Sequence, residues 1–363
     1  MSSRTSKRLR GQLRIAGMPH SLSWRQRPHG WEVRSELGME IDGAPIFIMG
    51  IMPRSGTVWL RQLLLQHPRC AGTSPWEDWL VPHAHWLQHF VEDVFDYWQP
   101  RTEVRPEWLY EGLGKGLLSI WEGRIGEKRL VTKTPSVRNL DLFFRFFPGA
   151  YLLVLVRDGR AVVESAARTS GLDYETGARR WARAAREILK FRQEAGDAGG
   201  RMLVVRYEDL YSSLNTELRR ILEFVRLPVD EYDFDAARNL PVRGSSAVSR
   251  TSSDRVHWTP VEKTSDFRPL SRWQHWTRFR HERFNWIAAS YLEAFGYEPV
   301  RFGGPRAFWA ALNVASDVRW WLTLAPRAAR RHFPGYLRLI APRWARGTGR
   351  TRSAWGRTTP GKA

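Results

Sequence analysis

The sequence has one cysteine, Cys70, among its 363 residues. A single thiol cannot form a disulfide within the chain, so that kind of crosslink is excluded, and a reducing compartment suits the protein. No stretch of about 18 uncharged apolar residues occurs, so we expect no transmembrane helix. No apolar segment follows the basic N-terminus, so we expect no signal peptide. These absences predict a cytoplasmic protein.

Acidic residues are scarce at the two ends of the chain. Residues 1–38 hold eight Lys or Arg and two Glu, and residues 301–363 hold thirteen Lys or Arg and a single acid, Asp317. The whole chain carries a formal charge of +20, so residues 39–300 are left nearly neutral at +2. Basic ends of this kind are usually solvated, and they can also contact anionic lipid. We expect no specific nucleic-acid partner, and the oligomeric state stays open.

Three apolar runs lack the polar alternation of a half-exposed strand. They lie at 46–50, 151–156 and 202–206, and such runs are typical of parallel strands buried on both faces. Helical patterns separate them, which predicts an α/β fold: a P-loop-like parallel sheet with helices on both faces, plus a helical C-terminal extension. Such sheets bind ligands beyond the carboxyl ends of their strands. The expected helices are 57–67, 160–169, 176–194, 212–226 and 278–295.

Composition divides the chain into three segments. Residues 1–40 are basic and show little periodicity, so we expect them to be loosely structured. Residues 41–300 hold the alternating strands and helices and form the main domain. Residues 301–363 form a basic amphipathic helical tail, in which 308–324 and 332–344 combine Trp and Leu with Arg. This composition is typical of helices at a membrane interface, and the alternatives are packing on the main domain or a dimer contact.

The turn after the first apolar run carries the most specific pattern. It reads Pro53-Arg54-Ser55-Gly56-Thr57, and an amphipathic helix follows. A strand, a tight turn and a helix N-terminus make an anion site, since free backbone N–H groups and the positive end of the helix converge there. Gly56 allows close approach of a phosphate, and Thr57 adds a hydroxyl. The lysine that follows the second glycine of a nucleotide-triphosphatase loop is absent.

The run at 151–156 also ends in a cationic motif. Arg157-Asp158-Gly159-Arg160 leaves the strand, and Ser165 follows on the next helix. At a strand end Arg157 can present a guanidinium fork, and Ser165 can donate its hydroxyl to the same anion. The alternative is an exposed turn followed by a surface serine. Two such motifs in this order are hard to obtain by chance.

The two motifs resemble those of sulfotransferases that use 3′-phosphoadenosine 5′-phosphosulfate (PAPS). The first resembles their 5′-phosphosulfate loop, and the second resembles their 3′-phosphate motif. Lys133-Thr134-Pro135 and Tyr207-Glu208-Asp209-Leu210 also occur in family order, so the resemblance covers roughly residues 44–300. It implies PAPS-dependent transfer of a sulfuryl group without a metal. The residues that it assigns to PAPS are Arg54, Ser55, Gly56, Thr57, Val58, Arg157, Ser165, Tyr207, Ser252 and Arg272.

Sulfuryl transfer needs cations near the leaving oxygen and a base for the acceptor proton. Arg54 and Lys133 are the candidate cations. The histidine that small-molecule sulfotransferases carry after Lys-Thr is absent, and the chain resembles the bacterial and tyrosylprotein branch, which implies Glu77 as base. Flanking tryptophans could raise the pKa of a carboxyl group by desolvation. Asp78 competes for this role, and the alternative for Glu77 is to place charge in the first turn of a helix.

The acceptor is not fixed by these motifs. A tryptophan-rich segment, 76–125, is expected to form part of its wall and would suit a glycan, a lipid, a phenol, another metabolite or a peptide tyrosine. Two other functions stay open. A P-loop kinase would need the missing lysine. A catalytically dead scaffold that binds 3′-phosphoadenosine 5′-phosphate (PAP) would be expected to have lost Arg54, Ser165 or Glu77, and all three are present.

Overall fold

The computed structural model describes residues 10–13, 22–27, 30–35, 43–99, 103–195, 200–241 and 269–332. Ser252 and residues 333–344 of the second predicted tail helix lie outside the described residues. The chain divides into two compact units. One consists of residues 1–276 and 287–299, and the other of residues 277–286 and 300–363.

The central sheet consists of five parallel strands: β4 (Ile46–Gly50), β5 (Cys70–Gly72), β6 (Arg129–Thr134), β7 (Tyr151–Val156) and β8 (Met202–Arg206). Their order is β5-β6-β4-β7-β8. The register pairs Ile48 with Lys133 on one side and with Leu153 on the other. The three apolar runs of the sequence are the strands β4, β7 and β8, with the predicted bounds. The predicted fold class is therefore confirmed.

The helices around the sheet follow the predicted pattern, with one exception in the second half of the domain. The helix expected over 212–226 is present over 214–224, and the residues just before it, 207–212, form a further short helix that was not expected; the two are separated at Ser213, where φ is −133°. The bounds are α1 (Thr57–Leu64), α2 (Leu80–Trp98), α3 (Pro106–Ile125), α4 (Phe143–Phe146), α5 (Gly159–Ser170), α6 (Tyr174–Ala195), α7 (Tyr207–Ser212), α8 (Leu214–Phe224) and α9 (Phe234–Arg238).

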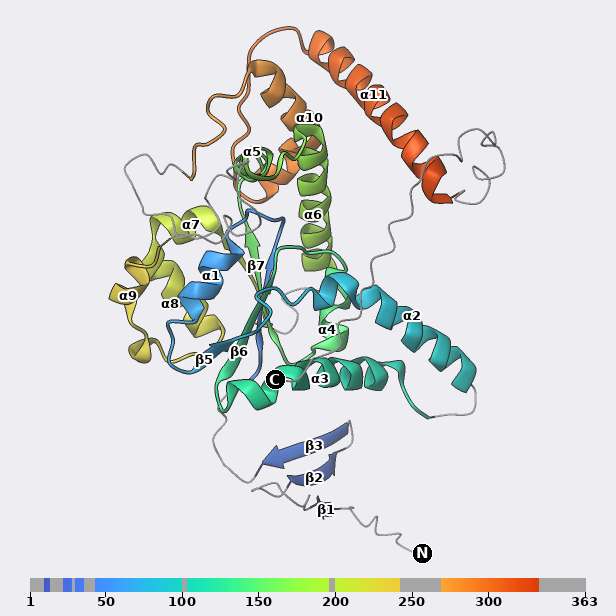
Figure 1. Cartoon of the computed structure of the whole chain (residues 1–363), viewed down its shortest axis with the longest axis vertical. Coiled ribbons are helices and arrows are strands. Elements are labelled where there is room, and N and C mark those ends of the chain that lie inside the picture. Colours follow the sequence, from blue (N-terminus) through green and yellow to red (C-terminus); the bar gives the residue numbers. More distant parts are fainter. Residues whose placement is uncertain are drawn as a thin grey trace, which may run out of the picture. The chain divides into compact units, whose positions relative to one another are not determined.

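Both faces of the sheet are covered by helices. Figure 1 shows α1, α7, α8 and α9 on one side and α3, α4 and α6 on the other. On the first side, Ile48 and Leu153 belong to one core cluster with side chains of α1 and α8. On the second side, the ring of Phe47 lies 5.1 Å from that of Phe143 and 4.7 Å from that of Phe147. Burial on both faces explains why these strands are apolar at every position.

The N-terminal segment contains regular structure that we did not expect. The strands β1 (Arg10–Leu13), β2 (Leu22–Arg27) and β3 (Gly30–Ser35) form an antiparallel sheet, in which Trp24 pairs with Val33. Apolar residues stand only at alternate positions here, and arginines fill many of the others. Such short alternations are weak signals in a sequence. The boundaries of the three predicted segments remain predictions.

The second unit is built on two helices, α10 (Arg278–Ala294), whose first half belongs to it, and α11 (Arg306–His332). Arg283 joins them, because its guanidinium donates to the carbonyl oxygen of Asn313 at 3.0 Å and pairs with Asp317 at 2.6 Å. α11 is longer than the 308–324 helix expected from the sequence. Among the described residues, no helix is both long and apolar enough to span a membrane.

Candidate active site

The turn between β4 and α1 is closed so tightly that it requires glycine twice. Gly56 has a φ of +102°, and a Cβ added to it would lie 2.6 Å from the ring of Tyr207. A Cβ added to Gly50 would lie 2.5 Å from the hydroxyl oxygen of Ser55. The turn therefore packs directly on Tyr207 and leaves the first backbone N–H groups of α1 without a side-chain cap.

Ser55 places an unmatched polar atom in this turn. Its side chain is fully buried, and its hydroxyl oxygen has no hydrogen-bond partner among the described residues. Thr57, the first residue of α1, is also buried. Buried hydroxyl groups nearly always have a partner, and helix N-termini attract anions. This turn therefore has the donors of an anion site.

Three arginines converge beside the turn. Arg157, at the end of β7, is 4% exposed and donates to the carbonyl oxygens of Arg54 at 2.8 Å and Pro269 at 2.7 Å. The side chains of Arg54 and Arg272 both donate to the hydroxyl oxygen of Ser165, at 3.2 Å and 3.4 Å. Residues from β7, α5 and two loops thus form one cationic cluster around Ser165.

Burial and mutual repulsion disfavour the charges of this cluster. Burial, together with the charges of the neighbouring guanidinium groups of Arg157 and Arg272, lowers the pKa of Arg54 to about 10. Burial, with the charge of Arg157, also lowers the pKa of Arg272. A bound anion would relieve this repulsion, so the cluster is arranged to receive negative charge.

Tyr207 fills the space between the turn and the arginines. It is buried, and the guanidinium carbon of Arg157 lies 4.3 Å from the centre of its ring. Its neighbour Glu208 accepts from the backbone N–H of Asp158 at 3.0 Å and from the hydroxyl of Tyr297 at 2.6 Å. Glu208 therefore ties the ends of β7 and β8 together and serves the fold.

Lys133 and Glu77 form a second group at the end of β6. Lys133 is 1% exposed, and its ammonium donates to Glu77 Oε1. Trp79 Nε1 donates to the other oxygen of Glu77 at 3.0 Å. Burial lowers the pKa of Lys133, and Glu77 partly offsets this effect. The structure thus joins two of the predicted catalytic residues, whereas the side chain of Arg54 bonds Ser165.

Asp78 is engaged differently from Glu77. Its carboxylate accepts from the hydroxyls of Thr132 at 2.7 Å and Thr134 at 2.9 Å, and from the backbone N–H of Leu80 at 2.9 Å. These bonds fix the start of α2 against β6. Three donors on one carboxylate indicate a structural role.

Arg61 is a site residue that the sequence analysis missed. It lies on α1, buried, and its Nη2 donates to the carbonyl oxygen of Thr73 at 2.9 Å, while its guanidinium carbon stacks 5.4 Å from the ring of Trp76. A Cβ on Gly72 would clash with it. Arg61 therefore holds the segment that carries Glu77. The only signal in the sequence is a charged residue on the apolar face of a helix.

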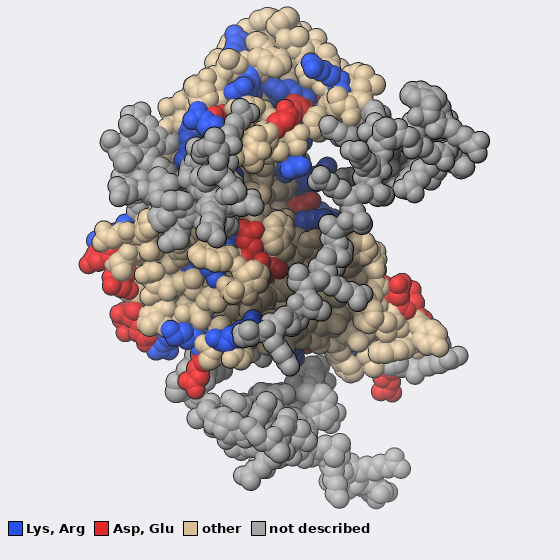
Figure 2. All heavy atoms as spheres, in the orientation of Figure 1, with Lys and Arg blue, Asp and Glu red and all other residues tan. Residues whose placement is uncertain are grey.

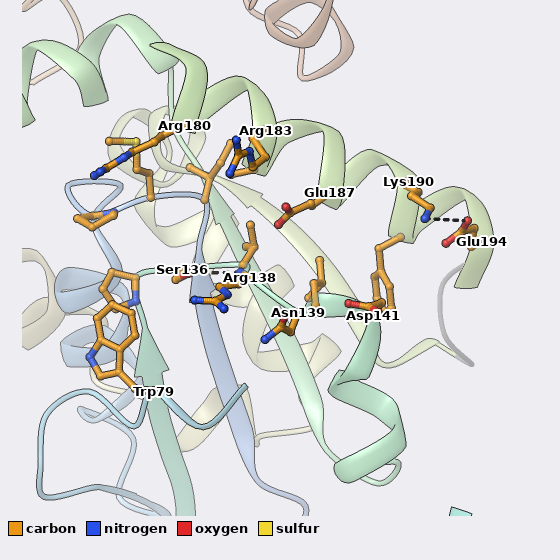
Figure 3. Close-up of a pocket in the computed structure, with 18 residues that line it drawn as sticks. Trp79, Ser136, Arg138, Asn139, Asp141, Arg180, Arg183, Glu187, Lys190 and Glu194 are labelled. Carbon is orange, nitrogen blue, oxygen red and sulfur yellow. Dashed lines mark hydrogen bonds and ion pairs between the residues drawn. The ribbon is translucent and has the colours of Figure 1, made fainter. Parts of the chain in front are cut away.

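A cavity of about 730 Å³ opens beside this second group. Pro53, Trp79 and Pro135 line it next to the turn and to Lys133, and α6 forms its opposite wall with Arg183 and Glu187 (Figure 3). Of the segment 76–125, which we expected to form a wall, Trp79 is the residue that lines this cavity. Other tryptophans of that segment, Trp86 and Trp108 among them, are exposed.

The fold and the site together define an α/β protein with an anion-binding turn, a cationic cluster and a lysine–glutamate pair at the carboxyl ends of its strands. Residues 45–231 match the model of the sulfotransferase family, and the chain belongs to that family. The family predicted from the sequence motifs is thereby confirmed. The residue roles predicted within the site remain predictions.

Its curated relatives include protein-tyrosine sulfotransferases. Protein-tyrosine sulfotransferase A of Caenorhabditis elegans is 28% identical over 213 residues, which are 55% of this chain and 54% of the relative. Protein-tyrosine sulfotransferase 1 of Danio rerio is 27% identical over 274 residues, 70% of this chain and 73% of the relative. The chain spans about half the length of the C. elegans relative and 38% of a Drosophila melanogaster one.

A solved structure with a similar chain is the sulfotransferase domain from the Synechococcus PCC 7002 olefin synthase. It is 23% identical, with a TM-score of 0.45, and the match covers 70% of this chain and 95% of that one.

Proposed function

We propose that this protein transfers a sulfuryl group from PAPS to an acceptor hydroxyl. The observation that carries the proposal is the grouping of three arginines beside the N-terminus of α1: Arg54 and Arg272 donate to Ser165, and Arg157 donates to the carbonyl oxygen of Arg54. Three guanidinium groups next to a helix N-terminus, one buried and two half-buried, suit a ligand with several phosphate charges. The sequence motifs and family membership support PAPS as that ligand.

The two ends of PAPS are bound by different residues. Arg157 and Ser165 hold the 3′-phosphate. The turn formed by Ser55, Gly56, Thr57 and Val58 receives the 5′-phosphosulfate through backbone N–H groups and hydroxyls, including the Ser55 hydroxyl that lacks a partner. Arg54 and Arg272 are assigned to PAPS as well, because both donate to Ser165. Tyr207 supports the turn near the adenine, and Ser252 stays assigned to the 5′-phosphate on sequence alone.

PAPS supplies an activated sulfuryl group whose departure leaves negative charge on the bridging phosphate oxygen. Lys133 and Arg54 stabilise that charge. Lys133 suits this role because it is buried at a strand end and its lowered pKa makes it a readier proton donor. Because Lys133 also donates to Glu77, it links the leaving oxygen to the carboxylate that takes the acceptor proton.

Glu77 is the better candidate for the base than Asp78. The oxygens of Asp78 are taken by two threonine hydroxyls and a backbone N–H that fix α2. Glu77 instead accepts from two side chains, Lys133 and Trp79, and its own side chain is 26% exposed. It can therefore accept a proton from an acceptor hydroxyl that enters from the cavity beside Trp79.

The cavity favours a polar acceptor. Seven of its lining residues are charged: Arg138, Asp141, Arg180, Arg183, Glu187, Lys190 and Glu194. An apolar acceptor would strip water from these groups without replacing their hydrogen bonds, which is unfavourable. Glycans and peptides meet this condition better than lipids or simple phenols. A peptide tyrosine is one candidate, because the relatives are named protein-tyrosine sulfotransferases.

The proposal is tested by measuring how much the 3′-phosphate contributes to binding. PAP and adenosine 5′-phosphate differ only in that group, so calorimetry with both ligands isolates it. Arg157→Ala should weaken PAP at least about tenfold and leave adenosine 5′-phosphate nearly unchanged, since a charge-assisted hydrogen bond is worth roughly 1.5–3 kcal/mol. Arg192→Ala, an exposed arginine on α6, is the matched control and should change neither.

Equal weakening of both ligands by Arg157→Ala would contradict the assignment. Binding of Mg-ATP in place of PAP would favour the kinase alternative. PAP binding without transfer from labelled PAPS to any glycan or peptide in an acceptor screen would favour the scaffold alternative.

A further inference from the structure

α11 carries an apolar face that is largely exposed among the residues that the structure describes. Val314, Val318, Trp321 and Leu322 are spaced i, i+4, i+7 and i+8, so they share one side of the helix. Trp321 is 65% exposed and Leu322 is 67% exposed, and the two valines are more than half exposed. Large side chains with this exposure on one stripe are unusual for a helix that packs only on its own chain.

The neighbouring face of α11 is attached to the start of α10. Arg283 is buried and bonds Asn313 and Asp317, and Trp286 Nε1 donates to Asp317 Oδ2 at 2.9 Å. These contacts fix the rotation of α11 about its own axis. The apolar stripe is therefore held facing away from α10.

The charge around the stripe has one sign. Asp317 is the single acid among residues 301–363, and its carboxylate is occupied by Arg283 and Trp286. The same 63 residues hold thirteen Lys or Arg. Arg319 lies beside the stripe on α11, and Arg327, Arg330 and Arg331 follow on the same helix. The tail thus offers apolar groups and positive charge, and its one acid is neutralised internally.

We propose that α11 docks on the surface of an anionic lipid membrane, with Val314, Val318, Trp321 and Leu322 among the headgroups and acyl chains. Arginines beside an apolar stripe with a tryptophan are typical of interfacial helices. Anionic headgroups attract the basic residues, and the apolar side chains bury in the boundary region. This inference is independent of the sulfuryl-transfer proposal.

Two other possible partners of the apolar stripe agree less well with its exposure and with the charge of the tail. A second copy of the chain would bring two tails of charge +12 together, and like charges repel. A nucleic acid would satisfy the arginines, but its phosphate backbone gives no partner to Leu322 and the valines. An anionic membrane satisfies both features at once.

The test is sedimentation of the full chain with lipid vesicles. Vesicles of equal parts phosphatidylcholine and phosphatidylglycerol should bind the protein, and vesicles of phosphatidylcholine alone should bind it much more weakly. Raising the salt to about 1 M should release most of the protein, since the Debye length falls to about 3 Å. The double variant Trp321→Ser, Leu322→Ser should lower the partition coefficient at least about tenfold.

A matched control separates this face from exposed aromatic residues in general. Trp86 and Phe90 on α2 are also large and exposed, so Trp86→Ser, Phe90→Ser should leave the partition unchanged. All variants change exposed residues, and equal melting temperatures would establish that they fold. Absence of wild-type binding to the anionic vesicles, or equal binding by the α11 variant, would overturn the proposal. So would a dimer in light scattering that the α11 variant converts to monomers.

Discussion

Arg54 is a residue whose charge the fold tolerates rather than favours. Burial and the charges of Arg157 and Arg272 lower its pKa to about 10. In the free protein the burial and repulsion of the Arg54 charge lower the free energy of unfolding. A bound anion relieves both, so the same arrangement strengthens anion binding. Sites that destabilise the free protein in order to bind a ligand are a common source of trade-offs between stability and function.

The first prediction concerns Arg54→Gln. The ligand-free variant should be at least as stable as the wild type, while its stabilisation by PAP should be much smaller. Because the pKa of Arg54 is lower in the folded than in the unfolded protein, the penalty is fully present below about pH 10 and declines as the pH rises above it. Urea titrations should therefore show a variant advantage that is constant up to about pH 9 and shrinks beyond about pH 10.

A variant that is clearly less stable than the wild type at neutral pH would contradict this account. It would mean that the hydrogen bond from Arg54 to Ser165 outweighs the repulsion within the cluster.

The second prediction separates the two neighbouring carboxylates. Glu77→Gln keeps an acceptor oxygen for Lys133 but cannot take a proton, so PAP affinity should persist while kcat falls by roughly 10²–10⁴. Asp78→Asn should instead lower the free energy of unfolding by about 1–3 kcal/mol. The NH₂ group of the new side chain cannot accept the hydrogen bonds that the hydroxyls of Thr132 and Thr134 donate to Asp78. Calorimetry, urea titration and turnover of labelled PAPS measure the three quantities. If Glu77→Gln retained turnover, the base would lie elsewhere.

At the scale of elements, the turn before α1 depends on a glycine for two separable reasons. Gly56 has a positive φ, and a side chain there would also strike Tyr207. Gly171, at the end of α5, is also left-handed, with a φ of +65°, and has open space where a Cβ would lie. The two positions therefore share the conformational cost and differ in the clash.

The third prediction uses this pair. Gly171→Ala should destabilise the protein by about 1–2 kcal/mol, the ordinary cost of a left-handed conformation for an L-residue. Gly56→Ala should cost more than that and should also weaken PAP binding, because the turn must shift away from Tyr207. Equal destabilisation by the two substitutions, with PAP binding intact, would show that the turn can relax without harm to the site.

The fourth prediction concerns the segment between β5 and α2. Arg61→Met removes the bond to Thr73 and the stacking on Trp76, so the segment that carries Glu77 should loosen. As a positioning effect this should lower kcat more than it raises the Kd of PAP. Arg61→Lys should restore part of the rate, since lysine keeps the charge and one donor. A loss of PAP affinity with unchanged kcat would contradict the role.

The sequence predicted the elements whose signals are local. β4 and β7 are buried at every position, so each appears in the sequence as an unbroken apolar run, and the edge strand β8 is apolar except for Arg206. β1, β2 and β3 have only alternate apolar positions among arginines and were not expected. The short helix α7 was not expected because six residues are too few to show a helical period, and it ends where Ser213 N donates to Asp209 O.

The residues of the candidate site also fall into those with a local signal in the sequence and those without one. The anion turn and the residues Arg157 and Ser165 are short motifs that a sequence can reveal. The clamp of Arg61 on Thr73, and the three donors on Asp78, join residues that lie on different elements and have no fixed spacing. Such tertiary contacts cannot be read from composition, so the sequence left Asp78 as a competitor of Glu77, and the structure adds that the two carboxylates have different partners.

For the molecule as a whole, charge is divided between core and ends. Figure 2 shows acidic and basic side chains interspersed over the described part of the face in view, as expected for a core that is nearly neutral. Most of the net positive charge lies in residues 1–38 and 301–363, which do not include any residue assigned to PAPS. Removing the tail charge should therefore change membrane partition and leave PAP affinity unaltered.

The most direct test of the central claim is the melting temperature of the protein with PAP, compared with Mg-ATP and with buffer alone. The PAP sample also contains a metal chelator. A ligand at 100 times its Kd stabilises the folded state by about 2.7 kcal/mol, which should raise the melting temperature by a few degrees. The account predicts a shift with PAP that needs no metal and a much smaller one with Mg-ATP. A folded protein that PAP does not stabilise would contradict it.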